Sequence, residues 1–260
     1  MTKHLIPAAL AAVLAAAAPI AQAFPEKTIT IVVPTAAGGG NDAMARTIAQ
    51  KLGPLLGQTV IIDNRAGANG SIASEFVARA PADGHTLMLG YIATHAMNPA
   101  LQKLRYDPVA DFAPIGLVGY SPTLMVANTN VPIKDVKDLI AQLKAKPDRY
   151  AYASAGNGTA PHFAAELFKL SAGVEMLGVP YKGAAPAVSD TIGGQTQVMF
   201  PSLFTGAPHD QVLNDKEVIK RIEDHGADVE TSTPEQLGDM VKSELGKWKD
   251  VVQKARLTAD

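Results

Sequence analysis

Short runs of apolar and β-branched residues alternate with helix-periodic segments from Phe24 onward. Such alternation is typical of βαβ units, whose strands pair in a mostly parallel sheet. Clusters of glycine, proline and asparagine separate the segments at Gly53-Pro54, Asn64–Gly70 and Pro81–Gly84. In this first half we expect strands over 28–33, 59–63 and 85–90, and helices over 42–52 and 71–80.

A second cycle of the same kind follows a proline-rich passage over residues 106–122. Two such halves, joined near residues 119–122, predict two lobes. Beyond Phe204 the pattern predicts helices over 216–225 and 234–256, the latter with a proline in its first turn. In the second half we expect strands over 123–128, 150–154, 174–181 and 195–200, and helices over 134–145, 161–172 and 185–194.

The first 23 residues have the pattern of a secretory signal peptide. Lys3 and His4 precede an alanine-rich apolar run, and Ala21–Ala23 forms an A-x-A cleavage pattern, so we expect the mature chain to begin at Phe24. A membrane anchor is the alternative, but the run is short for a span. With no cysteine for disulfides or lipid attachment, the sequence predicts a free periplasmic protein.

Charge adds one exclusion. The chain has 23 Lys and Arg against 25 Asp and Glu, and basic residues such as Arg46 and Arg79 are scattered. Nucleic-acid binding needs a clustered basic surface, which this distribution does not predict. The composition is otherwise that of an ordinary globular protein.

Three glycines, Gly38–Gly40, follow the first expected strand and precede its helix. No lysine follows them, so they do not form a Walker A phosphate loop. Gly38, Gly40 and Ala43 fit a dinucleotide fingerprint, with Asp63 as the ribose ligand, but Pro34–Ala37 separates the strand from the tight turn. Glycine backbone and free N–H groups at a helix start favour an anion in general, including a carboxylate.

A similar loop occurs in the second half, where Gly156 and Gly158 precede Thr159 and Pro161 at a helix start. Two such loops, one in each lobe, are expected to converge on one small anion in a cleft. The alternative is that both are tight turns with ordinary helix caps.

Long motifs in consistent order then resemble one family, the periplasmic receptors of tripartite tricarboxylate transporters, known as Bug receptors. The resemblance covers nearly all of Phe24–Phe204 and the last helix. It rests on FPEKTITIVVPTAAGGGNDAMAR, VIIDNRAGANGSIASEFVARAPADGHTLMLG, NPAL, YDPVADFAPIGLV, YASAGNGTAPHFAAELF, VPYKGAAPAVSDTIGGQTQVMFPSLF and STPEQLGDMVKSELGKWKDVV.

The resemblance implies an α/β fold of the two-lobed periplasmic binding-protein type (type II, Venus-flytrap-like), with each lobe a mostly parallel sheet flanked by helices. It implies no enzyme activity, no cofactor and no metal. The expected partners are a small carboxylate and the integral-membrane permease subunits, with the receptor a monomer that closes on its ligand. The expected division is 1–23 signal peptide, 24–119 lobe 1, 120–204 lobe 2, and 205–260 linker and C-terminal helices on lobe 1.

In that family two loops hold the ligand carboxylate, largely through backbone N–H groups and ordered water. A carboxylate beside an anionic ligand repels it, so Asp42 is expected to cap the helix or order neighbouring amides. Pro201 is expected beside the cleft. The positions that match the family's binding residues are Thr35, Ala36, Ala37, Gly38, Gly39, Asp42, Ser154, Ala155, Gly156, Gly158, Thr159 and Ser202.

Other polar residues carry weaker signals. The histidines have no metal spacing, and His162 is the one placed best for a ligand contact. Lys182 is expected to be a solvated loop residue, and Ser202 lacks the G-x-S-x-G elbow of a hydrolase nucleophile. The remaining histidines considered are His85, His95 and His209.

The chain departs from the family after Phe204, where a long segment that returns to the first lobe is largely absent. Its loss is expected to leave a sheet edge or apolar face open and to alter lobe closure. The alternative function is therefore a shortened homologue that acts as a sensory or interaction protein, or that has lost ligand binding.

Overall fold

A computed structural model describes residues 24–38, 40–120, 123–147, 149–201 and 232–258. The expected signal peptide before Phe24, Gly39 and Ser202 of the expected binding set, His209, and the expected helix 216–225 lie outside these ranges. Within them, no helix is both long enough and apolar enough to span a bilayer.

The first half forms a three-stranded parallel sheet in the order β2-β1-β3. The central strand β1 (Ile29–Val33) is mostly buried, since it pairs on both sides and its run of β-branched residues packs on both faces. The other elements are α2 (Gly40–Leu56), β2 (Val60–Asn64), the short 3₁₀ turn η1 (Ala68–Gly70), α3 (Ser71–Ala78) and β3 (Thr86–Met88).

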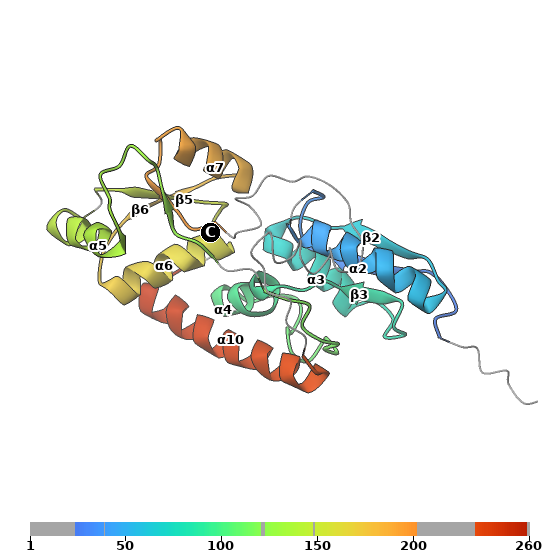
Figure 1. Cartoon of the computed structure of the whole chain (residues 1–260). Helices are drawn as coiled ribbons and strands as arrows, with labels where there is room; N and C mark the ends of the chain where they lie inside the picture. The colour runs from blue at the N-terminus through green and yellow to red at the C-terminus, as the bar shows by residue number, and fades with distance from the viewer. Residues whose placement is uncertain (1–23, 39, 121–122, 148, 202–231, 259–260) are drawn as a thin grey trace, which may run out of the picture.

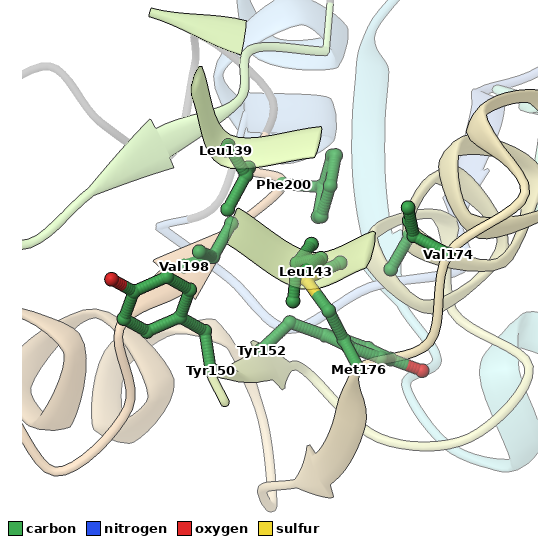
Figure 2. Packing of buried hydrophobic residues seen from close by; sticks show 9 residues of the cluster. Leu139, Leu143, Tyr150, Tyr152, Val174, Met176, Val198 and Phe200 are labelled. Atoms are coloured by element: carbon green, nitrogen blue, oxygen red, sulfur yellow. The ribbon is translucent and has the colours of Figure 1, made fainter. Parts of the chain in front are cut away.

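The second half forms a four-stranded sheet in the order β4-β7-β5-β6, with β5 parallel to both β6 and β7. Side chains of α5, Leu139 and Leu143, pack over this sheet with Tyr152 and Val198 (Figure 2). Its elements are β4 (Val126–Ala127), α5 (Val136–Ala145), β5 (Ala151–Ser154), α6 (Ala160–Ala172), β6 (Leu177–Pro180), α7 (Ala184–Ile192) and β7 (Val198–Met199).

A third group of elements lies against both halves. It consists of the π-helical turn η2 (Ala93–Met97), the short helix α4 (Asn98–Leu101) and the long helix α10 (Pro234–Ala255), which lies beneath α6 and α4 in Figure 1. Helix α10 contacts η2 and α4 on one side and α6 on the other. A buried cluster joins Trp248 of α10 to Phe163 of α6 and to Ala96 and Met97 of η2. The two lobes therefore share a core.

The predicted helices and strands are present in the described ranges, with one correction. Gly53-Pro54 does not end the first helix, which continues to Leu56 and is followed by Gly57 at a φ of 64°. Pro54 lies in the last turn of the helix. Its missing N–H removes one backbone hydrogen bond there, and the helix still continues to Leu56. A left-handed glycine, rather than the proline, ends this helix.

Candidate functional site

The first candidate loop leaves the carboxyl end of β1. Thr35 is half-buried, and the next three residues, Ala36, Ala37 and Gly38, are exposed. Gly38 has a φ of 82°, a conformation that glycine adopts without strain. The Asn64 side chain, at the end of β2, donates to the Thr35 carbonyl at 3.2 Å and so fixes the loop to the neighbouring strand. The Thr35 Oγ1 atom is buried, and no partner for it is found in the described ranges.

The side chain of Asp42 holds this loop in place through hydrogen bonds. Its Oδ2 accepts from the Gly38 amide at 2.9 Å and from Arg46 Nε at 2.9 Å, and the side chain is almost fully buried. Burial opposes ionisation, but hydrogen bonds from Arg46, Gly38 and Asn64 outweigh it, so the pKa of Asp42 lies below its usual value. The expectation that Asp42 orders a neighbouring amide agrees with this geometry.

The second candidate loop leaves the carboxyl end of β5. Ser154 is buried, and its Oγ accepts from the Gly156 amide at 3.4 Å. Gly156 has a φ of 121°, and a Cβ there would lie 3.3 Å from the Tyr181 carbonyl. The carbonyl of Ala155 accepts from the Gly183 amide at 3.2 Å. The loop is thus anchored on its carbonyl side to the segment after β6.

Thr159 precedes α6, but its hydroxyl donates to the Gly156 carbonyl at 2.6 Å and does not cap the helix. The first turn of α6 therefore has no side-chain cap, and its N–H groups carry the positive end of the helix dipole. His162 supports the loop through Nδ1, which accepts from the Gly158 amide at 3.2 Å. His162 Nδ1 is thus an acceptor in this structure.

Both loops contact the segment Gly67–Gly70. A Cβ on Gly70 would lie 2.9 Å from Pro34 Cβ, at the start of the first loop. On the other side, Asn69 Nδ2 donates to the backbone carbonyl of Asn157 in the second loop at 2.7 Å. The two predicted loops are therefore neighbours across the lobe boundary, with Gly67–Gly70 between them.

Sequence reasoning missed Asn69 and Asn98. Asn98, in α4, is fully buried and donates from Nδ2 to the Asn69 carbonyl at 2.8 Å. Its Oδ1 is buried without a partner in the described part of the chain. The Asn-Gly pair at residues 69–70 was a visible turn signal, but nothing in the sequence indicated a contact 88 residues away.

The remaining candidates lie elsewhere or have structural contacts. Lys182 is exposed, as expected. His85 is buried against Phe24, with ring centroids 5.0 Å apart, at the opposite end of β3 from the loops. His95 is paired with Thr94 Oγ1 at 2.8 Å, and burial lowers its pKa to about 4. In the described ranges no group of three or more His, Cys, Asp or Glu is placed to hold a metal.

Two hollows in the molecule do not coincide with these loops. One of about 700 Å³ lies between residues 99–111 and α10. The other, of about 610 Å³, lies beside α6 and is lined mainly by apolar side chains, among them Met97, Leu167 and Trp248. Neither is lined by a residue of 34–38 or 154–159. The loops are the stronger candidate because they combine glycine backbone, an uncapped helix start and buried polar atoms without partners.

Comparison with known proteins gives a family for this arrangement. Residues 44–214 match the family described as tripartite tricarboxylate transporter family receptor. Protein BugT of Bordetella pertussis is 39% identical over 181 residues, which are 68% of this chain and 56% of that protein. A protein from Pseudomonas sp. strain P51 is 39% identical over 184 residues, 70% of this chain and 54% of its own. The chain thus spans just over half the length of these relatives.

Solved structures share the fold. The Rhodopseudomonas palustris protein Rpa4515, solved with adipate, superposes with a TM-score of 0.78 at 27% identity, over 91% of this chain and 99% of that one. MatC of Rhodopseudomonas palustris, with bound malate, superposes with a TM-score of 0.75 at 29% identity, over 88% and 100%. These similarities confirm the predicted two-lobed α/β binding-protein fold.

Proposed function

Because the chain belongs to the tripartite tricarboxylate transporter receptor family, we propose that it is an extracytoplasmic receptor that captures a small carboxylate between its lobes. It would then deliver the carboxylate to the integral-membrane permease subunits of such a transporter. The observation that carries the proposal is the pairing of loops 34–38 and 154–159 through Gly67–Gly70.

The chemistry of the loops supports an anionic ligand. Each follows a parallel strand and precedes a helix, so backbone N–H groups gather where a helix dipole is positive. Glycine at residues 38, 156 and 158 lets the backbone approach a ligand. Relatives of the same fold were solved with adipate and with malate, both carboxylates.

The proposal assigns different roles to residues within the loops. Ala36, Ala37 and Gly156 would contribute backbone N–H groups, and Gly158, whose amide donates to His162, would shape the second loop. The buried Thr35 Oγ1 would gain a partner in the ligand or in water. Asp42 would remain with Gly38 and Arg46 and would shape the loop rather than touch the ligand. Gly39, Ser154, Ala155, Thr159 and Ser202 complete the proposed set.

We propose binding without covalent chemistry or a cofactor. Among the described residues, two titratable side chains beside the loops have structural contacts, Asp42 with Arg46 and His162 with the Gly158 amide. Catalysis would need a free acid or base within hydrogen-bond reach of the ligand. Asp63, the ribose ligand of the alternative nucleotide interpretation, accepts from Arg65 Nε at 2.8 Å.

The location and assembly of the protein are part of the same proposal. It would act in the periplasm after cleavage before Phe24, as a monomer with lobes at 24–119 and 120–204 and the C-terminal residues packed beside lobe 1. Helix α10 also contacts α6, so closure would have to take place around the core shared by Phe163 and Trp248.

A second candidate function is an interaction or sensory role without delivery of solute. It is favoured by one feature of the first sheet. In the described ranges β3 lies at the edge of the first sheet and pairs with β1 alone. An open strand edge is a place where another chain can pair.

Thermal unfolding with a panel of mono-, di- and tricarboxylates tests the proposal. A ligand at about a hundred times its dissociation constant should stabilise the fold by roughly 2.7 kcal/mol. Thr159→Val, which removes the hydroxyl bond to Gly156, should weaken this shift, whereas Thr129→Val on the exposed surface should not. A cooperative transition that no carboxylate shifts would favour the second candidate function instead.

A further inference from the structure

The side chain of Asn69, in the segment Gly67–Gly70 that lies between the two candidate loops, reaches the second loop across the lobe boundary. It extends from the first half and donates to the Asn157 carbonyl at 2.7 Å. The acceptor is backbone, in the middle of the loop between β5 and α6. This hydrogen bond therefore fixes the position of the second loop relative to the first lobe.

The backbone around Asn69 is unusual. Four successive residues have positive φ: Gly67 at 129°, Ala68 at 44°, Asn69 at 51° and Gly70 at 90°. Asparagine tolerates this left-handed conformation, whereas alanine adopts it at a cost. Such conformations persist only where the surrounding structure holds them, and they gather at functional sites.

The surroundings do hold Asn69. Asn98, fully buried, donates from Nδ2 to the Asn69 carbonyl at 2.8 Å. This bond also fixes the orientation of the Asn98 amide, because the Asn69 carbonyl needs a donor. Across the boundary, a Cβ on Gly158 would lie 2.7 Å from Asn69 Nδ2 and 3.5 Å from Asn98 Oδ1. Only glycine fits this approach without displacement of its neighbours.

We propose that Asn69 is a positioning residue that holds the second loop against the first lobe and so stabilises the arrangement of the lobes in this structure, which we call closed because the Asn69–Asn157 hydrogen bond joins them. The inference rests on the proposed receptor function, because closure matters to a protein that captures a solute between two lobes. Asn98 supports Asn69, and Gly158 leaves the space that the contact needs.

The interlobe distance can be measured directly in the full chain. Since the chain has no cysteine, Leu55→Cys in α2 and Ile192→Cys in α7, both strongly exposed, provide unique spin-label sites in the two lobes. Two further changes are then made at residue 69. Asn69→Asp keeps the size but loses the donor, and Asn69→Gly keeps the left-handed backbone and loses the side chain. Asn130→Asp, on the exposed surface of the second lobe, is the matched charge control.

Loss of one hydrogen bond should raise the ratio of open to closed molecules by about two- to tenfold in both Asn69 variants. Asn130→Asp should leave the distance distribution unchanged. A purely local role would lower the melting midpoint without moving this distribution. An unchanged distribution in both Asn69 variants, or a parent protein with no closed population, would overturn the inference. Because this readout needs no ligand, a failure of carboxylates to bind would count against the proposed function alone.

Discussion

A hydrogen bond joins Asp42 and Gly38 at the start of α2, where the carboxylate Oδ2 accepts from the glycine amide at 2.9 Å. The same oxygen accepts from Arg46 Nε at 2.9 Å. One loop amide is therefore already occupied, and a ligand in this loop would have to use others. The negative charge of Asp42, beside the proposed anion site, is compensated by Arg46, four residues further along α2.

Removal of this charge should loosen the loop. We expect Asp42→Asn to destabilise the protein by about 1–3 kcal/mol, since a nearly buried carboxylate with two hydrogen-bonded donors is replaced by a neutral amide. Chemical denaturation in urea measures the change. Asp239→Asn, which breaks the exposed pair with Lys242, is the control and should have little effect. Equal effects of the two changes would contradict the structural role of Asp42.

Below neutral pH, His95 should make stability depend on pH. Burial lowers its pKa to about 4, whereas an unfolded histidine has a pKa of about 6.5. Folding therefore favours the neutral imidazole of His95. Its contribution to the free energy of unfolding is complete above about pH 6.5 and falls as the pH drops toward about 4. The loss should reach about 3 kcal/mol. His95→Gln should flatten the curve in this window, and an unchanged slope would show that other groups dominate it.

Two glycines with similar φ values allow the cost of backbone strain to be distinguished from the cost of a steric clash. Gly38 and Gly158 have φ values of 82° and 72°, but a Cβ on Gly38 would meet no described atom within 4 Å, whereas one on Gly158 would meet Asn69 at 2.7 Å. Both Gly→Ala changes should cost about 1–2 kcal/mol of strain. Gly158→Ala should cost more than Gly38→Ala in urea denaturation, and the reverse order would contradict the packing at the lobe boundary.

Helix α10 should be essential to both lobes. Trp248 is buried against Phe163, with ring centroids 5.2 Å apart, and its indole Nε1 donates to Glu244. We expect Trp248→Ala to destabilise the protein by about 3–5 kcal/mol. Met240→Ala, at an exposed position of the same helix, should change the free energy of unfolding far less. If the Trp248 variant unfolds like the parent, α10 is not part of the shared core.

The sequence predicted those elements whose pattern is local. β1 is a run of β-branched residues and α5 an amphipathic helix opened by Asp135, which accepts from the Asp138 amide. Both follow from strand propensity and helix capping. Gly53-Pro54 was misjudged because a proline in the last turn of a helix removes only one bond.

The elements at the centre of the molecule were harder to predict. Residues 93–97 form a π-helical turn in which Ala93, Thr94, Ala96 and Met97 are all buried. Without an exposed polar face, the segment lacks the alternation of polar and apolar residues that predicts a helix. The loops themselves were predictable from glycine and helix-start residues. Their junction was not, because the Asn69 side chain meets a backbone carbonyl that local pattern cannot reveal.

Titration of the ¹⁵N-labelled chain with malate or adipate, followed by amide chemical shifts, tests the central claim most directly. The account predicts that a binding carboxylate shifts the amides of Ala36, Ala37, Ala155 and Gly156 together, with one affinity for both loops. Movement confined to the hollow beside residues 99–111 and Lys249, or no movement with any carboxylate of the panel, would contradict it.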